Sequence, residues 1–457
     1  MSSDDSDMSS DDEYYGDNGE EFRGTILNNN YTLIEKIGFG SYSSVWLAYS
    51  IAREKYFAVK IQNCEDYEEG LEELKFLKRI KELKNNNFIN LVEGFEITKK
   101  DTINKKIKKG RKVFNKKVVE ISKFICMILP LKACSTYSLI KEGKFKYGFS
   151  DKLMENIIET VFSSINDLHN NLKICHTDLK PENFLIDGLS TKVNDLIEEY
   201  DRHNIISIYK KTLEMELNKN LDIKSSKNKE KIKKIKSNIL KKIHRNILEG
   251  MNLLNNDSEY DNLDDSEIES NDTNSDSEKI VINEKFLQNP LFCLTDFGSS
   301  IKIKDLGNDE IQTRYYRAPE VILENSYTEK IDIWSIGCVL YELYTGSILF
   351  DPDKDEECDR DYNHLLLIIK LCGDIPKNMV KKSPKKNDFF KNYKLKFDEN
   401  VERKLFSYNS DKNNELIIKL IQKCLIIDPD LRPSITEIIQ FYNSEKYKTS
   451  EVLFIND

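Results

Sequence analysis

The first third of the chain carries short apolar runs of the kind that form strands. Tyr31–Ser50 and Lys55–Gln62 are rich in β-branched and aromatic residues and predict strands, as does the apolar run Phe124–Leu129. Between them, Tyr67–Lys84 repeats apolar residues at helical spacing. This part of the chain therefore predicts a sheet accompanied by one helix.

The later part of the chain has mainly helical spacing. Helices are predicted from Asp151 onward, most clearly over Ile331–Tyr344 and Glu415–Ile426. Strands with one helix, followed mostly by helices, favour a small β-rich lobe and a larger α-helical lobe. We therefore predict an α+β fold with two lobes, the small one over residues 31–131 and the large one over residues 132–445.

Charged segments interrupt both lobes. The acidic stretch 1–22 predicts a disordered tail, and the Lys-rich stretch 99–117, between two strand-like runs, predicts a long hairpin insertion. The largest insertion covers about residues 189–279, with helical spacing of Ile and Leu first and an Asp/Ser/Asn/Glu-rich part, Asn255–Glu278, second. This insertion could mediate self-association, bind a partner or govern the location of the protein. Of the possible interpretations, we favour a disordered spacer.

The charge balance limits the classes of partner. The chain has 457 residues, of which 39% are hydrophobic and 32% charged, so it can bury a sizeable core. Its net charge of −10 argues against direct nucleic-acid binding and favours basic partners.

Cysteine usage and hydropathy bear on location. The nine cysteines are scattered without a CxxC pair, which favours free thiols in a reducing compartment over disulfides or a zinc site. No signal peptide opens the chain, and no charge-free apolar run is long enough to span a bilayer. We predict a soluble intracellular protein, in the cytoplasm or the nucleus and without membrane contact. The sequence does not fix its oligomeric state.

The small lobe carries two candidate phosphate-binding features. Gly38–Val45 reads GFGSYSSV, and its two glycines let the backbone approach a phosphate closely, although a plain turn between strands is the commoner origin of such a pattern. Lys60 follows an apolar run, where a lysine either binds phosphate or stays exposed. A buried Lys60 needs a carboxylate partner, for which the helix offers Glu72 and Glu73, and its apolar face favours Glu73.

The strongest chemical signal is the segment His176–Asn183, which reads HTDLKPEN. Asp178, Lys180 and Asn183 supply a carboxylate to accept a hydroxyl proton, a cation near the transferred phosphoryl group and a metal ligand. A surface loop rarely carries this string by chance. Leu294–Gly298, which reads LTDFG, adds Asp296 as a second magnesium ligand.

In this order, the motifs resemble those of eukaryotic protein kinases over roughly Tyr31–Tyr442, insertions excluded. The resemblance implies ATP and Mg²⁺ as cofactors and proteins as substrates. It makes Asp178 the catalytic base and places Lys180 at the γ-phosphate, with Asn183 and Asp296 on Mg²⁺.

The resemblance also implies the remaining nucleotide and activation-segment residues. Lys60 would bind the α- and β-phosphates and pair with Glu73. Glu320 would pair with Arg432 in a buried structural ion pair. The other implied ATP-binding residues are Ile37, Gly38, Gly40, Ser43, Val45, Ala58 and Leu131. The implied activation-segment residues are Thr313, Arg317 and Glu320.

Further motifs narrow the family. Lys180–Asn183 and Thr313 resemble the serine/threonine branch, and Tyr316–Glu320 resembles the CMGC group. Gly38–Trp46, Glu310–Arg317 and the long insertion are similar to SR-protein kinases, whereas the DFGSS sequence after Thr295 is similar to LAMMER and DYRK kinases. The resemblance to SR-protein kinases implies Arg/Ser-rich substrates. The acidic stretch Asp351–Asp361 is then either a docking site for arginines or a solvated loop.

Three departures from the family pattern bear on activity. Pro130 removes a backbone donor where the family has its hinge, so contacts to adenine are expected to differ. Thr177 stands where many kinases have an arginine that reads a loop phosphate, and Glu310 replaces a tyrosine of the DYRK relatives. We therefore expect activity without activation-loop phosphorylation.

Two alternatives to a protein kinase remain. One is a catalytically impaired pseudokinase or scaffold, which is disfavoured because Lys60, Asp178, Asn183 and Asp296 are all present. The other is a small-molecule kinase of the same fold, which is disfavoured by the activation segment Thr313–Glu320.

Overall fold

The computed structural model describes residues 22–40, 42–109, 112–141, 145–219, 229–254, 287, 290–353, 359–396 and 414–455. The predicted acidic tail, apart from Phe22, and the acidic segment Asn255–Glu278 lie outside these residues. The described residues fall into two compact units. The strand-rich unit draws on the ranges 1–74, 91–130 and 193–273, and the helical unit on 75–90, 131–192 and 274–457. The predicted α+β class is confirmed.

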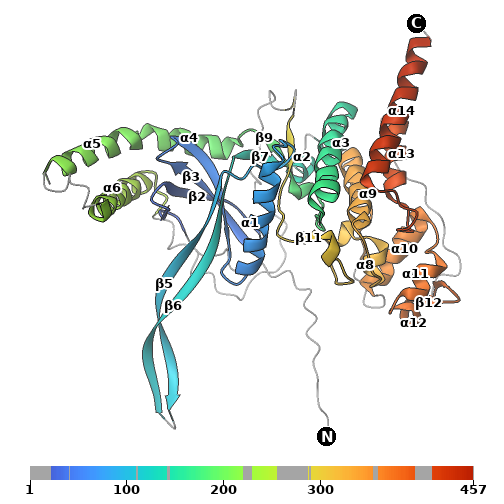
Figure 1. The fold of residues 1–457 in the computed structure, drawn as a ribbon, viewed down its shortest axis with the longest axis horizontal. Helices are drawn as coiled ribbons and strands as arrows, with labels where there is room; N and C mark the ends of the chain where they lie inside the picture. The colour runs from blue at the N-terminus through green and yellow to red at the C-terminus, as the bar shows by residue number, and fades with distance from the viewer. Residues whose placement is uncertain are drawn as a thin grey trace, which may run out of the picture. The chain divides into compact units, whose positions relative to one another are not determined.

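The sheet of the strand-rich unit joins six described strands in the order β1-β2-β3-β4-β6-β5, with antiparallel neighbours. They are β1 (Ile26–Leu27), β2 (Tyr31–Gly40), β3 (Ser43–Ser50), β4 (Lys55–Gln62), β5 (Glu93–Lys109) and β6 (Lys112–Leu129). β5 and β6 pair along their whole length and extend beyond the other strands as a two-stranded ribbon (Figure 1). The described residues of the Lys-rich stretch, 99–109 and 112–117, lie in this ribbon.

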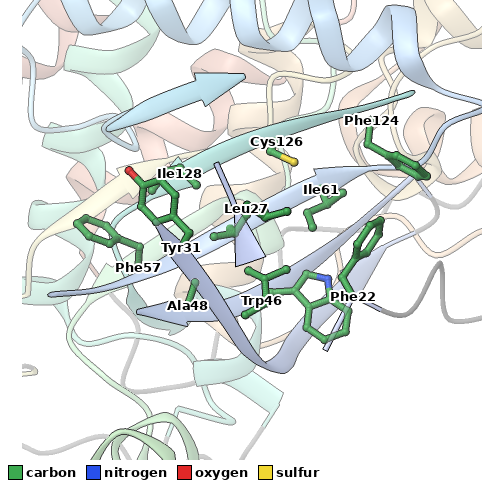
Figure 2. Packing of buried hydrophobic residues seen from close by; sticks show 12 residues of the cluster. Phe22, Leu27, Tyr31, Trp46, Ala48, Phe57, Ile61, Phe124, Cys126 and Ile128 are labelled. Atoms are coloured by element: carbon green, nitrogen blue, oxygen red, sulfur yellow. The ribbon is translucent and has the colours of Figure 1, made fainter. Parts of the chain in front are cut away.

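One face of this sheet carries a core of buried apolar side chains (Figure 2). Phe22 packs edge-on against Trp46 and Phe124, with ring centroids 6.3 and 5.3 Å apart. Tyr31 and Trp46 are fully buried. Such edge-to-face pairs add to the burial of apolar area and fix the orientation of the rings. The apolar residues that alternate along β2, β3 and β4 thus form the core that stabilises the sheet with the glycine-rich turn.

The large insertion folds onto the strand-rich unit. Its described part forms α4 (Thr191–Arg202), α5 (Ile205–Lys219) and α6 (Lys229–Gly250) (Figure 1). The disordered spacer that we favoured for residues 189–279 is therefore wrong for these helices. The physical reason is the spacing of Ile and Leu on α6, which buries Leu240, Ile247 and Leu248, among others, while the lysines face outward.

A buried polar network joins the insertion to β2. The Tyr200 hydroxyl lies 3.2 Å from Thr32 Oγ1 and 2.9 Å from His244 Nδ1, and His244 Nε2 lies 2.8 Å from the Leu33 carbonyl oxygen. Because a carbonyl oxygen can only accept, Nε2 carries the proton and Nδ1 accepts from Tyr200. The neutral imidazole is therefore fully hydrogen-bonded. Burial lowers the pKa of His244 to about 4, despite the Leu33 contact.

The strand-rich unit is expected to lose stability in mild acid. The unfolded imidazole takes up a proton near pH 6.5, whereas folded His244 resists protonation until about pH 4. The stability present above pH 6.5 is thus lost as the pH falls toward 4, by up to about 3 kcal/mol. Urea denaturation at several pH values, followed by tryptophan fluorescence, measures this slope.

Two variants separate His244 from the other titrating groups. His244→Gln should be less stable at neutral pH and should show a shallower slope between pH 6.5 and 4. Tyr200→Phe should lose about 1 kcal/mol at neutral pH but, because it keeps the titrating imidazole, should still lose stability between pH 6.5 and 4. Equal slopes for the wild type and His244→Gln would contradict the role of this imidazole.

The helical unit is built around one fully buried helix. α9 (Lys330–Thr345) buries every residue from Ile331 to Thr345, which explains why its sequence has no polar face. Gly346 ends it with φ 78°, and a Cβ at this position would lie 2.1 Å from the Lys146 carbonyl oxygen. None of the described helices is both long and apolar enough to cross a membrane.

The other elements of the helical unit surround α9. Its strands are β7 (Lys132–Ser135), β8 (Ile174–Cys175), β9 (Phe184–Asp187), β10 (Phe292–Leu294), β11 (Ile301–Lys302), β12 (Phe390–Lys391) and β13 (Lys394–Leu395). Its helices include α2 (Thr136–Lys141), α3 (Asp151–Asn166), α8 (Pro319–Ile322), α10 (Arg360–Cys372), α11 (Lys377–Lys382), α12 (Lys386–Phe389), α13 (Glu415–Cys424) and α14 (Ile435–Ile455). The remaining helix, α1 (Tyr67–Glu82), spans the boundary between the two units.

Candidate active site

A buried ion pair occupies the centre of the strand-rich unit. Lys60 on β4 places Nζ 2.8 and 2.9 Å from the two carboxylate oxygens of Glu73 on α1. Glu73 is 1% exposed, so its charge requires a partner of opposite sign. The pairing of Lys60 with Glu73 rather than Glu72 is therefore observed. The ion pair holds the lysine at a defined position on the sheet.

The glycine-rich turn joins β2 to β3, and β3 is the neighbour of β4, which carries Lys60. The register pairs Gly38 with Val45, Gly40 with Ser43, and Val45 with Lys60. A Cβ added to Gly40 would meet no atom within 4 Å, so the space beside its backbone is open. An open approach to backbone N–H groups fits a phosphate-bearing ligand.

The other residues predicted to contact ATP have defined places. Ile37 lies on β2, and Ala58, which is buried, lies on β4 and pairs with Leu129. Leu131 follows β6 and belongs to the helical unit. A common nucleotide site for these residues remains a prediction.

The catalytic-loop residues converge in the helical unit. Thr313 Oγ1 donates to Asp178 Oδ1 at 2.6 Å, and Lys180 Nζ lies 2.7 Å from Asp178 Oδ2 and 3.2 Å from Thr313 Oγ1. Burial alone would lower the pKa of Lys180, but Asp178, Glu182 and Asp296 outweigh it and raise the pKa. Lys180 is therefore a cation beside the carboxylate that would accept the hydroxyl proton.

A buried carboxylate anchors this loop. Asp332 on α9 accepts hydrogen bonds from the backbone nitrogens of His176 and Thr177 at 2.8 and 2.9 Å, and lies 2.8 Å from His169 Nε2. Burial would raise the pKa of Asp332, but the contacts with His169 and His176 outweigh it and lower the pKa. Thr177 has φ 68°, a strained conformation for a β-branched residue. The Asp332 contacts hold the loop in this conformation.

Asn183 and Asp296 are brought together by strand pairing. β9, which follows Asn183, pairs with β10, which precedes Asp296, and Thr295 N donates to the Asn183 carbonyl oxygen at 3.0 Å. Asn183 Nδ2 donates to the Asp178 carbonyl oxygen at 2.7 Å, so its Oδ1 is oriented away from that contact. Amide and carboxylate oxygens are the donors that Mg²⁺ prefers. The two residues therefore fit a magnesium site.

Comparisons with known proteins agree with this arrangement. The model of the protein kinase domain matches residues 31–197 and 196–442. The chain belongs to the protein kinase family. This confirms the resemblance drawn from the motifs.

Its relatives include proteins named as serine/threonine-protein kinases. The chain is 30% identical to serine/threonine-protein kinase L205 of Acanthamoeba polyphaga mimivirus, over 91% of this chain and 87% of the relative. It is 27% identical to serine/threonine-protein kinase SRPK of Physarum polycephalum, over 80% and 72%. A solved kinase domain, PF14_0431, has the same fold, with a TM-score of 0.55 at 23% identity over 92% of this chain and 97% of that one.

The activation segment of this kinase is held by the predicted residue Arg317 and by Gln312, which the sequence analysis missed. Buried Gln312 donates from Nε2 to Ser335 Oγ at 2.8 Å and accepts from the Ala318 backbone nitrogen at 2.9 Å. Arg317 donates to the Gln312 carbonyl oxygen and to Glu310 Oε1, the latter at 2.6 Å. No periodicity or motif marks Gln312, since its role depends on contacts distant in sequence.

The predicted pair of Glu320 and Arg432 is observed. Its two contacts are 2.7 and 3.0 Å, and Arg432 is completely buried. The guanidinium also donates to the carbonyl oxygens of Ile426, Ile427 and Lys330. A buried arginine with all these partners fastens the end of the activation segment to the body of the unit.

A second group of carboxylates lies beside the catalytic loop and was not predicted. Burial raises the pKa of Glu182, and one of its oxygens is buried without a hydrogen-bond partner among the described residues. Burial, together with the charge of Glu182, raises the pKa of Glu342 to about 7, although Tyr316 donates to it at 2.8 Å. The charge of Lys141 lowers the pKa of both carboxylates, but burial outweighs it, so a further cation beside them would be favoured.

The Thr313 hydroxyl is expected to matter for turnover. Thr313→Ala removes the donor to Asp178 and should lower kcat about tenfold, roughly the value of one charge-assisted hydrogen bond. Thr313→Ser keeps the hydroxyl and should stay near wild type. Steady-state kinetics at saturating ATP measures both variants, and equal loss in both would contradict the role of the hydroxyl.

Proposed function

We propose that this chain is a catalytically competent kinase that transfers the γ-phosphoryl group of ATP to serine or threonine hydroxyls of proteins. Asp178 accepts the hydroxyl proton as the oxygen attacks phosphorus, and Lys180 neutralises charge on the transferred group. Lys60 binds the other phosphates, with Asn183 and Asp296 as ligands of Mg²⁺. The metal supplies charge neutralisation on the phosphates.

One observation supports competence over a pseudokinase. The Asp178, Thr313 and Lys180 side chains form a closed set of contacts between 2.6 and 3.2 Å, with the base oriented by two donors. A scaffold has no need to orient a carboxylate in this way. The intact Lys60–Glu73 pair supports the same conclusion for the nucleotide side.

The decisive variant is Asp178→Asn. It removes the proton acceptor while keeping the shape of the side chain, and should lower the transfer of γ-phosphoryl to a basic protein by about 10²- to 10⁴-fold. Nucleotide binding should persist, since Lys60 and Asp296 are unchanged. Labelling with Mg·ATP and nucleotide binding by calorimetry give the two measurements.

Phosphatase-treated wild-type protein serves as the reference in this assay. The Gln312 and Arg317 contacts hold the activation segment without a phosphate, which supports the expected activity of the treated protein. Equal labelling by the wild type and Asp178→Asn would refute the proposed base. Near-complete loss of activity on phosphatase treatment alone would refute only activity without loop phosphorylation.

We further propose that the kinase prefers arginine-containing substrates, as expected from its SR-protein kinase relatives. The observation in favour is that burial raises the pKa of both Glu182 and Glu342, although the charge of Lys141 lowers it for each. An arginine of the substrate would add a second cation beside these carboxylates. Arginine forms bidentate hydrogen bonds with carboxylates and tolerates partial burial.

The acidic stretch Asp351–Asp361 supports this preference less well. Asp359 accepts from the backbone nitrogen of Asp361 and caps α10. Asp361 is already paired with Arg314 at 2.5 Å and Lys385 at 2.6 Å. The acidic residues 355–357 lie outside the described residues. Two of the seven carboxylates in the predicted docking site thus have structural roles.

The two glutamates should distinguish arginine-rich from neutral peptides. Glu182→Gln and Glu342→Gln should each raise KM for an Arg/Ser peptide about tenfold, the value of a charge-assisted hydrogen bond, and leave a neutral serine peptide unchanged. Because the pKa of Glu342 is about 7, its charge is lost as the pH falls below 7. The arginine preference should therefore decline from pH 8 to 6.

The pH profile supplies a matched control. Glu342→Gln has no titrating carboxyl at this position and should show a flatter dependence of arginine preference on pH. If both peptides respond equally to the substitutions, the arginine preference does not arise from this pair.

A further inference from the structure

The segment between Asp374 and Lys396 in the helical unit is strongly basic. It contains eight lysines and two aspartates, in a chain whose net charge is −10. Lys385 is paired with Glu324 and Asp361. Lys377, Lys381 and Lys386 have no ion pair within the part of the chain that the structure describes. Natural surfaces usually intersperse the two signs of charge, so an unbalanced group of cations is unusual.

These three lysines converge on one aromatic ring. The ammonium groups of Lys377, Lys381 and Lys386 lie 5.9, 5.7 and 5.7 Å from the centroid of Tyr393. Any two of them are therefore no more than about 12 Å apart. We call these four residues the lysine cluster. The electron-rich ring offsets part of the repulsion between the cations, but it brings no net negative charge.

The backbone holds the ring at this position. α11 carries two of the lysines, α12 begins with the third, and the hairpin of β12 and β13 carries the ring. Asn392 and Tyr393 form the two-residue turn of the hairpin and have φ 52° and 65°. Two left-handed residues are typical of a type I′ turn, in which tyrosine is strained. The lysine cluster is thus preorganised by helices and a turn.

We propose that the lysine cluster binds a short acidic segment of a partner protein, with carboxylate or phosphoserine groups contacting the three ammonium groups. An extended segment of three or four residues spans roughly 12 Å, which matches the reach of the cluster. The ammonium groups of Lys377 and Lys381 are on exposed side chains, so such a segment can reach them. This proposal is independent of the substrate preference, because it concerns charge of the opposite sign.

The position of the cluster favours a protein partner over nucleic acid. Lys385, next to Lys386, contacts Asp361, which contacts Arg314, the neighbour of Thr313 at the catalytic base. A protein docked at the cluster is therefore held on the same unit as Asp178. The net charge of −10 opposes the approach of a long polyanion such as nucleic acid.

Binding can be measured without kinase activity. The full chain is titrated into a fluorescent peptide of alternating aspartate and phosphoserine, into its unphosphorylated form and into single-stranded DNA, and anisotropy is recorded. The triple variant Lys377→Gln, Lys381→Gln, Lys386→Gln should weaken binding of the phosphorylated peptide at least about tenfold. Binding should also weaken with salt. The unphosphorylated peptide shows whether carboxylates suffice.

A matched variant controls for net charge. Lys233→Gln, Lys234→Gln, Lys241→Gln removes three exposed lysines from α6, in the other unit, and should bind the peptides as the wild type does. Tyr393→Phe keeps the ring and should also bind normally. Labelling of a neutral peptide should be unchanged in all variants, which shows that they fold.

Three results would overturn the proposal. The first is equal peptide affinity in the wild type and the triple variant of the cluster. The second is an equal loss in the α6 variant, which would indicate a general effect of charge. The third is tighter binding of DNA than of the acidic peptides with the same dependence on the cluster, which would identify nucleic acid as the ligand.

Discussion

The active centre of this kinase depends on the burial of one carboxylate, Asp332. It is fully buried on α9, and it accepts the backbone N–H groups of His176 and Thr177 while contacting His169. These contacts compensate for its desolvation and keep it charged. They also hold Thr177 in a left-handed conformation that a threonine rarely adopts. The residue that follows is Asp178, so the position of the proposed catalytic base is set from the interior of the unit.

The helices α4, α5 and α6 of the large insertion are part of the strand-rich unit. They are not an appendage, because Tyr200 and His244 are buried against β2 and share hydrogen bonds with Thr32 and Leu33. A buried polar network of this kind is specific, since each donor and acceptor has one geometry that satisfies it. The sheet that carries the glycine-rich turn and Lys60 is thus stabilised by hydrogen bonds from Tyr200 and His244, which lie more than 100 residues after β2 in the sequence.

Charges of opposite sign are separated on the helical unit. Glu182 and Glu342 lie beside the catalytic loop, where burial raises the pKa of both. The lysine cluster lies on α11, α12 and the β12–β13 hairpin. Asp361 pairs with both Arg314 and Lys385. The two proposals thus assign basic residues near the acceptor hydroxyl to the first group and an acidic segment of a partner to the second.

The sequence by itself determined the strands of the sheet and the apolar helices, and it supplied the candidate catalytic residue types. It could do so because phosphoryl transfer requires a carboxylate, a cation and metal ligands at fixed offsets, and because apolar periodicity follows from the geometry of strands and helices. It also singled out Glu73, since a buried lysine needs a carboxylate on the adjacent helix face.

Only the tertiary structure decided the parts that depend on contacts between distant segments. Gln312 has no motif, and its role arises from Ser335 and Ala318. The sequence left the acidic stretch as either a docking site or a solvated loop, and no local pattern reveals that Asp361 pairs with Arg314 and Lys385. The lysines around Tyr393 are separate in sequence and meet only because a turn places the ring beside two helices. The charge and burial around a residue depend on every segment that folds next to it, so the order of residues along the chain does not reveal them.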